Sequence, residues 1–193
     1  MCFKPMIRIR TPVKQYAHTV SSEIRTPVKR NLHTDVTGIN NKLAYQNHIN
    51  RLNNADDTFL VGVIMLDLNN LKRVNDTLGH EMGDRYMESF SAILAGMQNE
   101  RISAYRIGGD EFCVILEKTN AVEIHQILDS LERKINVYNE KNNIKISYAK
   151  GCEISTREHY YLMEELTKRA DSRMYENKRL MKGKRLDGRR LNV

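Results

Sequence analysis

Two apolar runs separated by a glycine-rich, acidic turn constrain the fold of this chain most strongly. The stretch "RIGGDEF" at residues 106–112 lies between the runs "ISAYRI" at 102–107 and "EFCVILE" at 111–117. Because these runs are rich in β-branched and aromatic residues, they predict two strands joined as an antiparallel hairpin. Gly108 and Gly109 are poor strand formers, but they permit a turn and let a ligand approach the backbone. The tip of this hairpin is therefore a candidate binding site.

Helical and strand patterns alternate through the rest of the body. Strands are expected at 58–68, a run that contains Asp67, and near 144–154. Helices are expected from Gly38, at about 70–78, after a break at 78–84, after a capping box of Asn120 and Glu123, and at about 160–178. We therefore predict the α/β (α+β) class, with a mixed, mostly antiparallel central sheet surrounded by helices in a palm-like, ferredoxin-related arrangement.

The net charge of +7 is distributed unevenly along the chain. Residues 1–33 hold seven Lys and Arg against Glu23, and residues 178–193 hold seven against Asp187, so residues 34–177 carry a charge of −5. A nucleic-acid-binding domain would gather basic residues on its folded face, whereas this body is acidic. We expect no nucleic-acid partner and treat the basic ends as solvated segments.

The composition of the chain also indicates in which cellular compartment the protein lies. The longest clean apolar run, "VGVIML" at 61–66, is far too short to cross a bilayer, and no apolar segment follows the first basic residues as in a secretory signal. Three cysteines form no CxxC pattern and no paired framework. We expect a cytoplasmic protein without membrane insertion.

Three segments are expected along the chain. Residues 1–33 are predicted to be a basic arm or linker, in which "IRTPVKQYAHT" at 9–19 returns as "IRTPVKRNLHT" at 24–34. Two copies are too few for a repeat fold. Residues 34–182 are predicted to form one compact domain, and residues 183–193 a basic tail.

Acidic residues from distant parts of the sequence suggest a metal site. If the strand at 58–68 lies beside the hairpin, Asp67 comes close to Asp110 and Glu111. Three carboxylates held together repel one another, so a cation is expected between them. Oxygen ligands suit Mg²⁺ or Mn²⁺, and Mg²⁺ usually arrives with substrate phosphates. The other interpretation is an exposed acidic hairpin turn without a ligand.

Five ordered motifs resemble the GGDEF family of diguanylate cyclases over residues 34–182. Besides "GGDEF" at 108–112, the chain has "VTGINNK" at 36–42, "DLNNLKRVND" at 67–76, "GHEMGD" at 79–84 and "ADSRMYENK" at 170–178. They are similar to the family patterns LTGLxNR, DxDxFKxxND, GHxxGD and ADxAxYxAK. The resemblance identifies residues 34–182 as a GGDEF catalytic domain.

The resemblance implies a homodimer that binds GTP on each subunit and condenses two GTP to cyclic di-GMP and pyrophosphate. The implied metal ligands are Asp67, the carbonyl of Leu68 and Asp110, with Glu111 beside them. The implied substrate-binding residues are Asn75 and Asp84 for guanine, Lys72 and Lys178 for phosphates, and Gly108 and Gly109 at the turn. Asp110 and Glu111 are the implied catalytic residues, and Glu111 either assists deprotonation of the attacking hydroxyl or binds a second metal.

Several positions depart from the family pattern. Thr34 replaces an aspartate before the LTG segment, Asn69 and Leu71 replace an aspartate and a phenylalanine, and Asn177 replaces an alanine. Lys182 is the nearest candidate for a further phosphate contact. The RxxD product-inhibition motif is absent, because residues 99–102 read "NERI". We therefore expect no feedback inhibition through that site.

Two alternatives to an active cyclase stay open. The chain could be a catalytically silent GTP-binding GGDEF regulatory module, or, less in keeping with its acidic body, a nucleic-acid-binding protein that uses its basic ends. Family members often depend on an input domain, so a sensor or partner protein is a possible further component.

Overall fold

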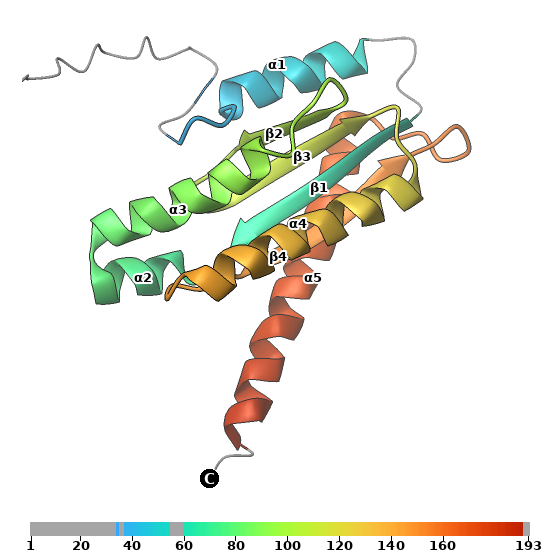
Figure 1. The fold of residues 1–193 in the computed structure, drawn as a ribbon. Helices are drawn as coiled ribbons and strands as arrows, with labels where there is room; N and C mark the ends of the chain where they lie inside the picture. Colours follow the sequence, from blue (N-terminus) through green and yellow to red (C-terminus); the bar gives the residue numbers. More distant parts are fainter. Residues whose placement is uncertain (1–33, 35–36, 55–59, 191–193) are drawn as a thin grey trace, which may run out of the picture.

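The computed structural model describes residues 34, 37–54 and 60–190, with side chains placed as far as residue 183. The elements, in order, are α1 (Lys42–Asn53), β1 (Val61–Leu68), α2 (Leu71–Leu78), α3 (His80–Ala95), β2 (Ile102–Arg106), β3 (Glu111–Glu117), α4 (Ala121–Lys141), β4 (Tyr148–Ser155) and α5 (Met163–Arg190) (Figure 1). The repeated segment at 9–34 falls outside the described residues except for Thr34. None of the described helices has the length and apolar character needed to cross a membrane.

Four antiparallel strands form one sheet in the order β2-β3-β1-β4. From β1 to β4 the chain follows the ferredoxin-like βαββαβ order, except that two helices, α2 and α3, stand in place of the first helix; α1 and α5 are added at either end. The predicted fold class and the predicted hairpin at 102–117 are therefore confirmed. Because β1 lies between β3 and β4, its end meets both the hairpin turn and the start of β4.

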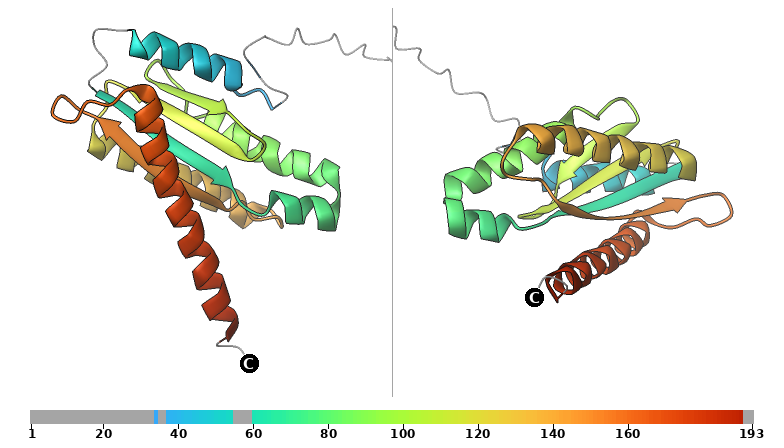
Figure 2. Two further views of the ribbon diagram at one scale, coloured as in Figure 1. Left: turned by 180° about the vertical axis from the view of Figure 1, so that it is seen from behind. Right: turned by 60° about the horizontal axis from the view of Figure 1, so that its bottom comes forward.

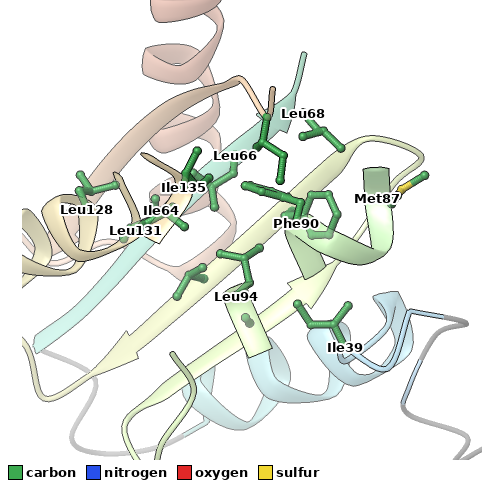
Figure 3. Close-up of a cluster of buried hydrophobic side chains, with 14 of the residues drawn as sticks. Ile39, Ile64, Leu66, Leu68, Met87, Phe90, Leu94, Leu128, Leu131 and Ile135 are labelled. Carbon is green, nitrogen blue, oxygen red and sulfur yellow. The ribbon is translucent and has the colours of Figure 1, made fainter. Parts of the chain in front are cut away.

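Helices cover both faces of the sheet. On one face α3 and α4 pack over alternate residues of β1, among them Ile64, Leu66 and Leu68, as Figure 3 shows around Phe90. On the other face α1 and α5 pack over Val63 and Met65 (Figure 2). Every residue of β1 is consequently buried, and its alternation places Asp67 on the face that α5 covers.

Several element boundaries differ from the sequence prediction, among them those of three helices. The first helix begins at Lys42 rather than at Gly38, because Gly38 has a φ of +81° and the Asn41 side chain accepts from the Ala44 N–H at 3.0 Å as a helix cap. The expected break at 78–84 is reduced to Gly79, whose φ of +87° turns the chain directly from α2 into α3. The last helix continues to Arg190 instead of ending near 178, since the Lys, Arg, Leu and Met residues after that point favour helix.

The packing of α5 on β4 depends on a glycine. A Cβ atom built on Gly151 would lie 2.1 Å from the Met174 backbone nitrogen and 2.2 Å from the Ala170 carbonyl oxygen. Helix and strand therefore touch backbone to backbone at this point. Two side chains of α5 also cover polar groups of the edge strand, since Asn177 Oδ1 accepts from the Lys150 N–H at 3.0 Å and Arg173 donates to the Cys152 carbonyl at 3.1 Å.

A buried polar cluster joins α1 to the hairpin. His48 contacts the Tyr105 hydroxyl through Nδ1, and Arg51 Nη2 lies 2.7 Å from His48 Nε2 and 2.6 Å from Glu117 Oε1. Glu117 Oε1 also lies 3.0 Å from His48 Nε2, so the histidine, arginine and glutamate side chains form one network in which the neutral ring finds a partner in either tautomer. Burial and the positive charge of Arg51 lower the pKa of His48, although Glu117, 3.0 Å from Nε2, opposes this shift. His48 is therefore held neutral.

We predict that Gly151→Ala lowers the free energy of unfolding by about 1–3 kcal/mol, because the added methyl group meets the backbone of α5 and cannot be accommodated by a side-chain rotation. Gly183→Ala is the matched control, since a Cβ there meets nothing within 4 Å. It should leave stability unchanged or raise it by about 0.5–1 kcal/mol. Urea unfolding followed by circular dichroism measures both, and equal stability of the two variants would contradict the packing described.

We also predict that stability falls as the pH drops below about 6.5, the ordinary pKa of histidine. In the folded protein the pKa of His48 is lowered below that value. As the pH falls, the unfolded chain therefore binds a proton at this histidine before the folded protein does, and this proton binding favours the unfolded state. The stability that the neutral His48 contributes is fully present above about pH 6.5 and is lost as the pH falls toward the pKa of the folded protein. Over that range the free energy of unfolding changes by up to about 1.4 kcal/mol per pH unit. His48→Gln should flatten the profile of unfolding free energy below about pH 6.5. An unchanged slope in the variant would contradict a neutral His48.

Candidate functional site

A small cleft opens where β1 ends beside the hairpin turn. It has a volume of about 180 Å³ and is lined by residues of the β1–α2 segment, the turn and α5, namely Leu68, Asn69, Asn70, Leu71, Lys72, Asp110, Lys178, Met181 and Lys182. Four residues predicted from the sequence thus come together here from three distant segments: Leu68, Lys72, Asp110 and Lys178. Lys182, the candidate for a further phosphate contact, lines the same cleft.

Asp67 lies beside this cleft and is already paired. Its carboxylate Oδ2 lies 2.6 Å from Lys178 Nζ, and the exposed fractions of the two side chains are 8% and 26%. Within the described part of the chain, the other oxygen, Oδ1, is buried and has no hydrogen-bond partner. A buried acceptor without a donor is costly, and a cation is the kind of group that would satisfy it.

Main-chain hydrogen bonds fix the turn against β1. The Leu68 N–H donates to the Asp110 carbonyl at 2.8 Å, and the Ile107 N–H donates to the Glu111 carbonyl at 3.0 Å. Arg106 closes the turn from outside, since its Nη2 donates to the Gly109 carbonyl at 2.9 Å. Sequence reasoning missed this role of Arg106, although the residue directly precedes the signature.

The three carboxylates do not converge as expected. Asp67 and Glu111 are opposite each other in the β1–β3 register, but among the described residues no group of three acidic, histidine or cysteine side chains is placed to hold a metal ion together. Two contacts explain the difference. Lys178 forms an ion pair with the Asp67 carboxylate. Glu111 folds back over the turn, so that its Oε2 would lie 2.5 Å from a Cβ atom built on Gly108. Gly108 therefore makes room for Glu111.

The predicted guanine-binding pair lies at the contact of α2 with α3, apart from the residues that line the cleft. A Cβ on Gly83 would lie 1.7 Å from Asn75 Oδ1, so the Asn75 side chain rests directly on the Gly83 backbone. The exposed Asp84 follows Gly83 in sequence. The structure therefore brings Asn75 next to the residue that precedes Asp84.

Asn69, a departure from the family pattern, has a structural role. Its N–H donates to the Ser147 carbonyl at 2.8 Å, its side chain donates to Ser147 Oγ at 3.1 Å, and its carbonyl accepts from the Tyr86 hydroxyl at 3.0 Å. These bonds hold the segment between β1 and α2 to Ser147, just before β4, and to Tyr86 of α3. An aspartate at position 69 could not donate to Ser147 when ionised.

The arrangement suits an anionic ligand that carries a cation. Three ammonium groups, from Lys72, Lys178 and Lys182, surround the cleft, and its acidic members are Asp110 and the neighbouring Asp67. The oxygen donors Asp67, the Leu68 carbonyl and Asp110 are those that Mg²⁺ prefers when phosphates complete its shell. A volume of about 180 Å³ is small for a whole nucleotide but fits phosphate groups.

Comparisons with known proteins point to one family. Residues 32–184 match the family model described as "Diguanylate cyclase, GGDEF domain". Diguanylate cyclase DgcN of Escherichia coli is 34% identical over 152 residues, which cover 74% of this chain and 36% of that protein. Cyclic di-GMP phosphodiesterase PdeR of Escherichia coli is 42% identical over 86 residues, which cover 44% of this chain and 13% of that protein. The chain thus spans about a third or less of the length of these relatives.

The fold comparison agrees. The GGDEF domain of DgcB from Caulobacter crescentus, solved in complex with c-di-GMP, superposes with a TM-score of 0.70 and covers 79% of this chain and 90% of that one. The two sequences are 22% identical, so this likeness is one of fold.

We predict that Arg106→Ala loosens the turn without unfolding the domain, because it removes the donor to the Gly109 carbonyl. Amide exchange of Ile107 and Leu68 should become about fivefold faster, which corresponds to about 1 kcal/mol of lost hydrogen bonding. The control is Arg101→Ala, since Arg101 donates instead to the Lys118 carbonyl at the other end of the hairpin. Equal protection of these amides in both variants would show that Arg106 does not hold the turn.

Proposed function

The chain belongs to the GGDEF-domain family, and we propose that it is a diguanylate cyclase that condenses two GTP to cyclic di-GMP and pyrophosphate. One observation carries the proposal. Leu68, Lys72, Asp110 and Lys178 line a single cleft beside Asp67, although they come from β1, α2, the hairpin turn and α5. This is the combination of oxygen ligands and cations that a metal-bound triphosphate requires.

Lysine side chains bind the phosphates in this proposal. Lys72 lines the cleft from α2 and Lys182 from α5, and Lys178 lies one helical turn before Lys182. An ammonium group is a compact charge on a flexible stem, so it can follow phosphate oxygens as charge moves toward the leaving pyrophosphate. Lys182 thus fills the place of the phosphate contact that the sequence pattern left unassigned.

Asp84 and Asn75 read the base. A carboxylate accepts from both N1–H and the 2-amino group of guanine, and adenine does not offer this pair of donors. Asp84 therefore selects GTP over ATP. Asn75, fixed against Gly83, offers a donor and an acceptor to the neighbouring purine edge.

The oxygen ligands fit Mg²⁺, with Mn²⁺ as a substitute. Asp67, the Leu68 carbonyl and Asp110 would hold the metal, with Glu111 beside them, and the buried Asp67 Oδ1 supplies an acceptor that has no partner among the described residues. The bound metal would neutralise charge on the transferring phosphate. Glu111 would need to turn away from Gly108 to reach either this metal, a second one, or the attacking hydroxyl.

The reaction joins two substrates, so two subunits are needed. The 3′-hydroxyl of each GTP attacks the α-phosphorus of the other, so two P–O bonds form and two pyrophosphates leave. Each hydroxyl proton passes to a base, for which Glu111 is the candidate. The protein mainly supplies alignment, which can contribute about 7–11 kcal/mol in favourable cases. A homodimer that apposes two clefts would therefore complete the active site. An attached sensor domain or a partner protein would be suited to control this assembly.

A GTP-binding regulatory module without turnover is the second candidate function. Two observations favour it. Among the described residues, no three acidic, histidine or cysteine side chains are placed to hold a metal ion together, and one similar protein is named as a phosphodiesterase. Such a module would bind GTP and gain thermal stability without releasing pyrophosphate.

We predict that the purified chain converts GTP to cyclic di-GMP in the presence of Mg²⁺, with a turnover per subunit that rises with protein concentration. Asp110→Asn should lower turnover at least about 100-fold, since it removes charge from the metal site while keeping the main-chain bond to Leu68. Chromatography of the products, with sedimentation to report dimers, makes the measurement. Bound GTP and a stable dimer without any product would contradict the cyclase and favour the silent module.

Asp84→Ala serves as the matched control at the other end of the nucleotide. It should reduce the preference for GTP over ATP in competition while the metal site stays intact. If Asp84→Ala weakened the binding of GTP and ATP equally, Asp84 would not be the residue that recognises guanine.

A further inference from the structure

The ion pair between Asp67 and Lys178 puts a cation of the protein where a metal ligand is expected. The pair is short, at 2.6 Å, and largely buried on the Asp67 side, where the exposed fraction is 8%. It leaves Asp67 Oδ1 buried and without a partner in the described structure. Lys178 therefore balances the charge of the carboxylate but contacts only one of its oxygens, and a divalent ion could satisfy the other.

A free metal ion nevertheless faces two obstacles. It would have to remove Lys178 from Asp67, and separating a buried pair leaves one charge uncompensated. It would also approach a cleft where Lys72, Lys178 and Lys182 outnumber Asp67 and Asp110. A triphosphate reverses this balance, because it brings negative charge to the lysines and carries the metal with it.

We propose that Lys178 acts as a substitute cation, which excludes free divalent metal from Asp67. Lys178 leaves Asp67 only when a nucleotide arrives. In the nucleotide-free protein Lys178 neutralises Asp67. When the metal-bound triphosphate enters, the Lys178 ammonium turns to the phosphates and Asp67 becomes a metal ligand. The inference rests on the proposed function, since it takes a nucleoside triphosphate as the ligand of the cleft.

The geometry of α5 supports such an exchange. Lys178 is 26% exposed and lines the cleft, so its ammonium group can reach either side. The helix itself is fixed by the contact of its backbone with Gly151 of β4, so only the flexible lysine stem needs to move. Asp67, at the end of a strand buried on both faces, stays in place.

A purely structural role makes a different prediction. If the pair only fastens α5 to β1, removal of Lys178 lowers stability and leaves metal affinity unchanged. If Lys178 excludes metal, its removal raises the affinity for metal alone and weakens the binding of nucleotide. The two effects have opposite signs, which a general loss of structure cannot produce.

The test is Mn²⁺ binding to the nucleotide-free protein, measured by electron paramagnetic resonance of the free ion. Lys178→Met should bind Mn²⁺ about tenfold more tightly than the unmodified chain, within the usual range of coupling between sites. The matched control is Lys182→Met, which removes an equal charge from the same cleft but no partner of Asp67, and should change the affinity much less. The double variant Lys178→Met with Asp67→Asn should lose the gain.

Unchanged or weaker Mn²⁺ binding by Lys178→Met, or an equal gain in Lys182→Met, would overturn the inference. If the methionine variant does not fold, Lys178→Gln carries the same expectation, because it keeps a hydrogen-bond donor toward Asp67 without the charge. GTP binding and product formation by the unmodified chain are measured in parallel. Absence of both would refute the proposed function, whereas normal GTP turnover together with no gain in Mn²⁺ affinity would refute only the role of Lys178.

Discussion

The backbone contact between α5 and β4 is the constraint on which the cleft depends. Because Gly151 has no side chain, the helix lies directly on the strand, and its next turns carry Lys178 and Lys182 across the end of β1. The same helix shields the outer edge of β4 through Arg173 and Asn177. This packing contact therefore positions α5 both to cover the edge strand β4 and to place its lysines at the cleft.

The opposite side of the cleft is set by the hairpin. The Leu68 N–H reaches over to the Asp110 carbonyl, and Arg106 holds the carbonyl of Gly109. His48 contacts both Tyr105, near the turn end of β2, and Glu117, at the far end of β3, and so fastens the hairpin to α1. The turn is consequently supported from within the sheet and from the helix that follows the N-terminal segment.

The sequence was most informative where a local pattern decides the structure. The hairpin followed from two β-rich runs around Gly108 and Gly109, and the start of α4 followed from its cap, since Asn120 Oδ1 accepts from the Glu123 N–H at 3.0 Å. Long-range contacts were harder to predict. That Asp67 meets Lys178 depends on how α5 crosses the sheet, 111 residues later in the chain, and no local pattern records that crossing. The structural roles of Arg106, Asn69 and Asn177 are also contacts between distant segments.

We infer that Asp67 and Asp110 hold a metal that arrives with a nucleotide, while Lys178 moves to the phosphates. A crystal structure with Mn²⁺ and a GTP analogue that does not react tests it most directly, because Mn²⁺ is located by its anomalous scattering. We expect a peak between the two carboxylates, with the Lys178 ammonium on phosphate oxygens. A nucleotide bound elsewhere, or a metal outside the cleft with Lys178 still on Asp67, would contradict it.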